Sequence, residues 1–143
     1  MFKKPLVGWF FRNMNAFPLD RGRVDTGTTR IIFDRLRKGR VVALFPEGRI
    51  RTEEESVLNG GSFKPGVLRI ACITKVPILP VVIVGTIAYR RFTSWLPLRR
   101  TVYGVNYGVP IEPLPGQTEV ELEPLLRQAF LDLHAELREA MKR

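Results

Sequence analysis

Apolar residues at helical spacing predict three amphipathic helices. The first covers about residues 25–38, stops at Gly39, and buries three apolar side chains: Ile31, Ile32 and Leu36. The second opens with Pro65-Gly66 and covers about residues 65–74. The third covers about residues 123–142, where apolar residues recur every three or four positions: Leu126, Phe130, Leu133, Leu137 and Met141.

Between these helices, short apolar runs predict strands. Residues 41–45 and 78–84 are typical of strands covered on both faces, and we expect them to be neighbours in one buried sheet. Pro80 indicates an edge position, a bulge or a break in the second run. Residues 101–109 resemble a further strand. The alternation predicts an α/β fold with a mixed, largely parallel sheet flanked by helices, in one domain covering residues 1–143.

Composition excludes several classes of protein. The chain has 143 residues with one cysteine, Cys72, and one histidine, His134, so neither an internal disulfide nor a Cys/His zinc site is expected. The longest apolar stretch, residues 76–88, is shorter than the roughly 20 residues of a membrane-spanning helix. We therefore expect a cytoplasmic protein, peripheral to a membrane, with no bound metal.

Charge is distributed unevenly along the chain. The net charge is +8 over residues 1–51, +4 over residues 52–100 and −3 over residues 101–143. A basic front with an acidic tail predicts a polyanionic partner, which could be a nucleic acid, an anionic lipid surface or a phosphorylated substrate. Residues 2–12 and 89–100 mix aromatic with basic side chains, which favours an anionic membrane interface. A helix docked on the core is the alternative for residues 2–12.

The segment Phe45-Pro-Glu-Gly-Arg-Ile-Arg51 carries the most informative chemistry. Glu47 and Gly48 follow the predicted strand 41–45, and ligands of open α/β sheets bind at the carboxyl ends of strands. Gly48 allows a ligand to approach the backbone closely. Arg49 and Arg51 can reach one anion if the segment is extended. A surface turn with solvated charges is the alternative.

Four sequence blocks resemble the motifs of the glycerolipid acyltransferases, the lysophosphatidic acid acyltransferase family. Phe45-Pro-Glu-Gly48 resembles the third motif of that family, although Arg49-Ile50-Arg51 stands where the family usually has Thr-Arg. The other three blocks occur in the expected order: Phe17-Pro-Leu-Asp-Arg21, Phe63-Lys-Pro-Gly66 and Val76-Pro-Ile-Leu-Pro-Val81. Together the four blocks lie within residues 17–85.

The resemblance implies transfer of a fatty acyl group from acyl-CoA or an acyl-carrier protein to a hydroxyl of a glycerol phosphate or lysophospholipid. It implies lysophosphatidic acid, or a related lysophospholipid, and an acyl thioester as partners, with no metal and no cofactor. By the same resemblance Arg21 holds the substrate phosphate, while Glu47 and Gly48 shape the glycerol phosphate site. We expect Arg49, Arg51 and Lys64 to converge with them in one basic pocket.

The first motif of the family, a histidine followed by an aspartate at the histidine-x-x-x-x-aspartate spacing, has no counterpart in the sequence. That histidine is the general base on the acceptor hydroxyl, so no catalytic residue is predicted. His134 is not followed by an aspartate at this spacing and is interpreted as a helix-face histidine. We expect a late start, a truncated gene or a noncatalytic relative, and little acyltransferase activity from this chain.

Two alternatives to the enzyme use the same charge pattern. A noncatalytic anionic-lipid binder on the same scaffold explains both the basic front and the missing base. A nucleic-acid binder is suggested by the net charge of +9 and by the arginines and aromatic residues of 89–100. The acidic tail and the lack of a nucleic-acid motif oppose that reading, so no nucleic-acid partner is predicted.

Overall fold

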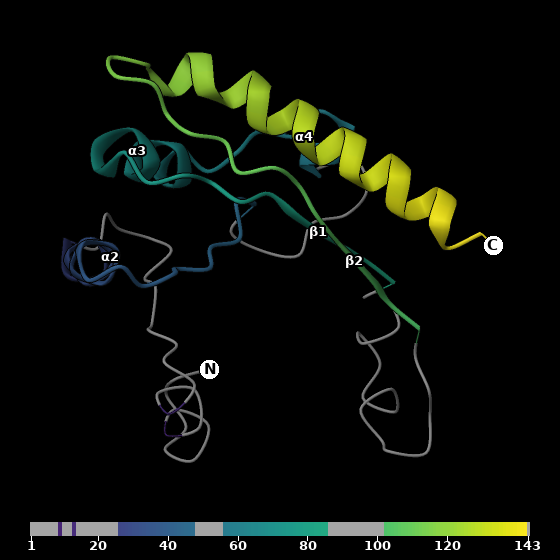
Figure 1. Ribbon diagram of the computed structural model, residues 1–143, viewed down its shortest axis with the longest axis horizontal. Helices are drawn as coiled ribbons and strands as arrows, with labels where there is room; N and C mark the ends of the chain where they lie inside the picture. Colours follow the sequence, from purple (N-terminus) through teal and green to yellow (C-terminus); the bar gives the residue numbers. More distant parts are fainter. Residues whose placement is uncertain (1–8, 10–12, 14–25, 48–55, 86–101, 143) are drawn as a thin grey trace. The chain divides into compact units, whose positions relative to one another are not determined.

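The structure, a computed structural model, describes Trp9, Asn13 and residues 26–47, 56–85 and 102–142 (Figure 1). Its backbone contacts divide the chain into two compact units, Met1–Leu44 and Phe45–Arg143. Within the described ranges, no helix combines the length and the apolar character that crossing a bilayer requires.

The first unit contains α2 (Thr26–Arg37), which confirms the first predicted helix. Thr28 and Ile32 are buried on it, whereas Ile31 is 42% exposed, so the prediction that Ile31 is buried is wrong. Gly39 ends the helix as predicted, because its φ of 68° is left-handed and lets Arg40 N–H donate to the Arg35 carbonyl at 3.0 Å.

The strand predicted at residues 41–45 is wrong. The segment has no strand assignment, and Val41 and Phe45 are 93% and 80% exposed. An apolar run becomes a buried strand only when a neighbouring strand satisfies its backbone and a second layer covers it. The described residues give this run no strand partner, and the sequence pattern alone could not reveal that.

The second unit contains the sheet of the described residues, formed by β1 (Val81–Val84) and β2 (Gly104–Tyr107). The two strands pair antiparallel, with Val81 opposite Tyr107 and Val84 opposite Gly104. The largely parallel order predicted for the sheet is therefore not found in the described part of the chain, although the mixture of helices with a small sheet is compatible with an α/β domain.

Pro80 interrupts the ladder, as predicted. Ile78 and Ile111 form an isolated antiparallel bridge, and two residues separate Ile78 from β1 while three separate β2 from Ile111. The extra residue is a bulge opposite Pro80, which has no N–H to donate. The Pro80 carbonyl still accepts from Gly108 N–H at 2.9 Å, so the two segments stay paired through the interruption.

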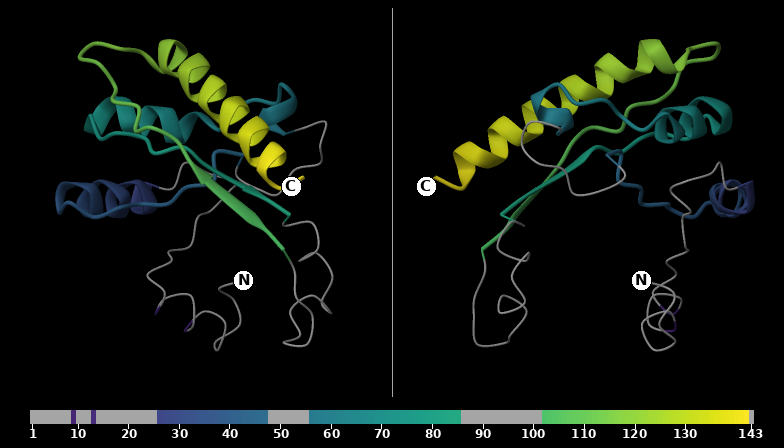
Figure 2. Two further views of the ribbon diagram at one scale, coloured as in Figure 1. Left: turned by 45° about the vertical axis from the view of Figure 1, so that its right-hand side comes forward. Right: turned by 180° about the vertical axis from the view of Figure 1, so that it is seen from behind.

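The helix α4 (Glu119–Ala140) packs against both strands and against α3 (Pro65–Thr74), as the views of Figure 2 also show. It begins four residues before the predicted start at residue 123. The carboxylate of Glu121 accepts from Thr118 N–H at 2.8 Å, and this first-turn bond stabilises the earlier start. The predicted second helix is confirmed by α3 at its predicted bounds.

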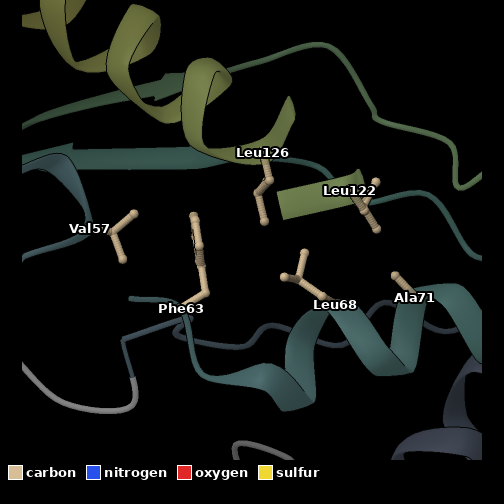
Figure 3. Packing of buried hydrophobic residues seen from close by; sticks show 6 residues of the cluster. All are labelled: Val57, Phe63, Leu68, Ala71, Leu122 and Leu126. Atoms are coloured by element: carbon tan, nitrogen blue, oxygen red, sulfur yellow. The ribbon is translucent and has the colours of Figure 1, made fainter. Parts of the chain in front are cut away.

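Two buried clusters hold the second unit together. The larger one lies between α3, α4 and the short 3-10 helix η2 (Val57–Asn59), and Figure 3 shows its six residues: Val57, Phe63, Leu68, Ala71, Leu122 and Leu126. The smaller one joins Val82 of β1 to Leu133 and Leu137 of α4. The first cluster includes Val57, whose N–H donates to Glu47, and Phe63, which precedes Lys64 in the chain.

Candidate functional site

Glu47 closes a loop of the chain upon itself. Its Oε1 accepts a hydrogen bond from Ser56 Oγ at 2.7 Å and another from Val57 N–H at 2.8 Å. These bonds join the two ends of the segment that carries Gly48, Arg49 and Arg51 in the sequence. Bonds to an ionised acceptor are about twice as strong as neutral ones, so the carboxylate fixes where that segment begins and ends.

The two predicted blocks around Glu47 and Lys64 are neighbours in space. Lys64 N–H donates to the carbonyl of Pro46, 18 positions earlier in the sequence, at 2.8 Å. Lys64 is also the N-cap of α3, and its side chain is exposed. The backbone of Lys64 is therefore held next to Pro46, the residue before Glu47, whereas the predicted convergence of the site side chains in one pocket stays a prediction.

A tight turn, residues 56–63, connects these two points. Ser56 caps η2 by accepting from Leu58 N–H at 3.3 Å, and its carbonyl accepts from Gly61 N–H at 2.8 Å. Gly60 has a φ of 93°, a left-handed conformation that favours glycine. The turn keeps residues 56–63 compact, and it leads to Phe63, whose side chain is buried in the core.

Arg127 anchors this turn to α4, and the sequence analysis did not single it out. Its Nη1 donates to the carbonyls of Val57 at 3.1 Å and Gly61 at 3.0 Å, and its Nη2 donates to Glu123 at 2.8 Å. Its guanidinium also lies 5.1 Å from the centre of the Phe63 ring. The four-residue spacing from Glu123 is a signal that could have identified it as an ion-pair residue, but nothing in the sequence indicates its backbone acceptors.

The structure describes two of the six predicted site residues. Glu47 and Lys64 are brought together through Pro46, as above. The other four lie outside the described residues: Arg21, Gly48, Arg49 and Arg51. The predicted pocket that joins them stays a prediction, and so do the membrane contacts predicted for residues 89–100 and for most of residues 2–12.

His134 lies on α4 in a partly buried position. Burial, and then the positive charge of Arg138, lower its pKa below the ordinary value, so the imidazole is neutral at neutral pH. At the histidine-x-x-x-x-aspartate spacing, the position that the family motif would give to an aspartate is residue 139, which is a glutamate. The interpretation of His134 as a helix-face histidine stays a prediction.

The described residues contain no other activated side chain. Burial, with the charges of Glu119 and Glu121, raises the pKa of the Cys72 thiol, which disfavours the nucleophilic thiolate. No group of three or more metal-ligating side chains occurs within these ranges. Within the described residues, the arrangement offers the hydrogen-bonded carboxylate of Glu47 and the exposed Lys64, whose positive charge suits the binding of an anion.

Comparison with known proteins identifies the class. The family model described as Acyltransferase matches residues 1–84, more than half of the chain, so the chain belongs to this acyltransferase family. The match includes the four sequence blocks and ends at the last residue of β1. The predicted resemblance to the glycerolipid acyltransferases is thereby confirmed.

The relatives are named for one acceptor. A chloroplastic 1-acyl-sn-glycerol-3-phosphate acyltransferase of Arabidopsis thaliana is 33% identical over 88 residues, which are 60% of this chain and 24% of the relative. The 1-acyl-sn-glycerol-3-phosphate acyltransferase of Bacillus subtilis is 31% identical over 85 residues, 59% of this chain and 40% of the relative. That of Streptococcus pneumoniae is 27% identical over 113 residues, 78% of this chain and 38% of the relative.

The chain thus spans about a quarter to two fifths of the length of the curated relatives it matches. No solved structure is significantly similar to it.

Proposed function

We propose that this chain binds the glycerol phosphate part of a lysophospholipid in a reaction of the 1-acylglycerol-3-phosphate acyltransferase type. The observation that carries the proposal is the loop closed by Glu47, which joins one motif block to the next through Pro46 and Lys64. The names of the relatives supply the acceptor, lysophosphatidic acid, whose phosphate matches the basic character of this part of the chain.

The acceptor phosphate is assigned to the arginines. In this proposal Arg21, Arg49 and Arg51 bind it, because a planar guanidinium donates two parallel hydrogen bonds to a phosphate. Gly48 allows the acceptor to approach the backbone, and Lys64 adds a positive charge next to the loop. Glu47 shapes the site by holding the loop closed rather than by touching the acceptor, since its Oε1 already accepts two bonds from the protein.

The acyl group comes from a thioester of coenzyme A or of an acyl-carrier protein. The acceptor hydroxyl attacks the thioester carbonyl and gives up its proton to a base, and the thiol leaves with a proton. The relatives' family uses a histidine as that base, and the sequence contains no histidine before His134. We therefore expect the 143-residue chain to bind the acceptor and to transfer acyl groups slowly, with neither a metal nor a cofactor taking part.

The missing base favours a second candidate, a noncatalytic binder of anionic lipid on the same scaffold. The basic front of the chain supports this candidate equally, and it shares the acceptor site with the enzyme. In both cases we place the protein at the cytoplasmic face of a membrane, held by its aromatic and basic stretches. The two candidates differ in whether thioester is consumed.

Binding and turnover are measured separately to test the proposal. The chain is titrated with lysophosphatidic acid and, as the matched control ligand, with a monoacylglycerol that has the same acyl chain without the phosphate. We expect at least tenfold tighter binding of the phosphorylated ligand, and a loss of that preference in Arg51→Met but not in Arg138→Met on the distant end of α4. Equal binding of both ligands would contradict the acceptor assignment.

Thioester release with acyl-CoA and lysophosphatidic acid then separates the candidates. Binding with negligible release supports the lipid binder, or a catalytic unit whose base is supplied by a further segment. Robust release that survives His134→Ala would show that a different group is the base. Robust release abolished by His134→Ala would show that His134 is the base, against the helix-face interpretation.

A further inference from the structure

Arg127 holds two points of the turn 56–63 that are four residues apart. One nitrogen, Nη1, donates to the carbonyls of both Val57 and Gly61, while Nη2 donates to Glu123. The Arg127 side chain is 25% exposed, so these bonds are partly shielded from water. A guanidinium with three acceptors is held in one orientation, because its planar fork fixes the direction of every N–H.

Val57 connects this anchor directly to Glu47. The N–H of Val57 donates to Glu47 Oε1 at 2.8 Å, and the carbonyl of the same residue accepts from Arg127 at 3.1 Å. A displacement of the turn relative to α4 therefore also moves the donor that closes the Glu47 loop. Val57 is thus the one residue that links Arg127 of α4 to the carboxylate of Glu47 through its backbone.

Phe63 fixes the other end of the turn. Its ring lies under the Arg127 guanidinium at 5.1 Å and contacts Phe130 with the ring centres 5.9 Å apart. The next residue, Lys64, donates its N–H to Pro46, the residue before Glu47. Arg127 therefore acts on Glu47 from both directions along the chain, through Val57 and through Phe63.

We infer that Arg127 is a positioning residue for the acceptor site, acting through the turn 56–63 on Glu47 without touching the acceptor. The inference rests on the proposed function, because it assigns Arg127 to the same site. Glu123 completes the arrangement by pairing with the guanidinium at 2.8 Å, which holds the side chain along α4 and compensates its charge.

Amide hydrogen exchange tests the first half of the inference without any ligand. Every amide from Val57 to Gly61 donates a described hydrogen bond within the turn or to Glu47, so local opening is read residue by residue. In Arg127→Met we expect exchange at Val57 and Gly61 to accelerate about tenfold, with α3 and β1 unchanged. Arg127→Lys keeps the charge but loses the fork and should give a smaller acceleration.

Arg138→Met, on the same helix, is the matched control and should leave the turn unchanged. Unchanged exchange at Val57 and Gly61 in Arg127→Met would overturn the inference. So would a uniform acceleration throughout α3, α4 and β1, because that pattern reports general loss of stability rather than release of one turn. If Arg127→Met fails to fold, Arg127→Lys and Glu123→Gln give the same comparison.

Affinity for lysophosphatidic acid tests the second half. We expect Arg127→Met to weaken binding about tenfold and Arg127→Lys to recover part of it, in the same order as the exchange rates. Faster exchange with unchanged affinity would overturn the positioning role, and weaker affinity with unchanged exchange would show direct contact instead. If the unaltered chain does not bind this ligand, the proposed function fails, while the exchange data still decide whether Arg127 holds the turn.

Discussion

Glu47 has a structural role, because its carboxylate binds two groups of the protein itself. The sequence places it next to two arginines and a glycine, which points to the site but not to its partners. In the structure its Oε1 accepts from Ser56 and Val57, nine and ten residues later. In the proposed function, a carboxylate so engaged acts on the acceptor only through the loop that it closes.

Replacing Glu47 should therefore lower stability as well as affinity. Glu47→Ala removes an ionised acceptor from two donors and should lower the free energy of unfolding by about 2 kcal/mol, while Glu47→Gln keeps one acceptor oxygen and should cost about half as much. Urea unfolding followed by circular dichroism measures both values. Glu112→Ala, at an exposed position, is the control, and equal stability of all three variants would show that the closure contributes nothing.

The pKa of His134 can be measured without ambiguity, because the chain has one histidine. Its NMR titration should show a midpoint below the ordinary value of 6.5, since burial and then Arg138 disfavour the imidazolium. In Arg138→Met the midpoint should rise but stay below that value, because burial is the larger cause. A midpoint at or above 6.5 in the unaltered chain would contradict the partly buried position of His134.

The same lowered pKa has a consequence for stability. The unfolded chain takes up the proton near pH 6.5, at a higher pH than the folded chain does. The stabilisation due to neutral His134 is therefore complete above about pH 6.5 and is lost as the pH falls towards the folded pKa. His134→Gln should flatten the dependence of unfolding free energy on pH in that window.

Arg127 marks the limit of prediction at this scale. Two of its acceptors are backbone carbonyls 66 and 70 residues earlier in the chain, and every residue has such a carbonyl. A sequence pattern can identify arginines that suit a phosphate, but it carries no information about which backbone turn a helix will meet. Only the packing of α4 against η2 determines that contact.

At the scale of elements, prediction succeeded where the determinants are local. The end of α2 at Gly39 and the start of α3 at Pro65 depend on the conformations those two residues allow. The interruption at Pro80 follows from its missing N–H. Residues 41–45 failed as a strand because a strand requires partners from elsewhere in the chain. The sequence left an edge position, a bulge and a break open at Pro80, and only the register distinguishes them.

Two glycines of the second unit have different surroundings, so replacing each with alanine should change stability in opposite directions. A Cβ on Gly108 would lie 2.7 Å from Pro80 Cγ and 3.0 Å from Leu133 Cδ1, so Gly108→Ala should lower stability by about 1–3 kcal/mol, because the proline ring cannot yield. Gly66, in the first turn of α3, has open space around it, so Gly66→Ala should raise stability by up to about 1 kcal/mol.

Thermal and urea unfolding of the two glycine variants provide the comparison. Each is the control for the other, since both add one methyl group to the same unit of the chain. Gly108→Ala as stable as the unaltered chain would mean that β2 and α4 separate easily at this point. Destabilisation by Gly66→Ala would mean that the first turn of α3 is more crowded than the structure shows.

At the scale of the whole molecule, charge is the property that the sequence determines outright. The basic excess of residues 1–100 and the acidic excess of residues 101–143 hold whatever the arrangement of the two units. The acidic groups include Glu119, Glu121 and Glu123 on the first turns of α4, where carboxylates favour the positive end of the helix dipole. The acidic tail thus has a structural reason, and we expect an anionic partner to bind the basic front.

Binding to lipid vesicles should therefore depend on lipid charge and on salt. Each lysine or arginine near an anionic surface contributes about 1 kcal/mol, and the screening length shrinks from about 10 Å at 0.1 M salt to about 3 Å at 1 M. We expect the chain to sediment with vesicles that contain an anionic lipid at low salt, to be released as salt rises, and to bind neutral vesicles weakly.

Trp9→Ser should reduce sedimentation further, because Trp9 is 65% exposed among basic neighbours in the sequence. Trp9→Phe is the matched control and should retain most of the binding. Equal sedimentation with neutral and anionic vesicles would contradict the electrostatic part of this prediction. Salt-dependent binding to duplex DNA without binding to either vesicle would instead support the nucleic-acid alternative, because phosphate contacts release counterions in the same way.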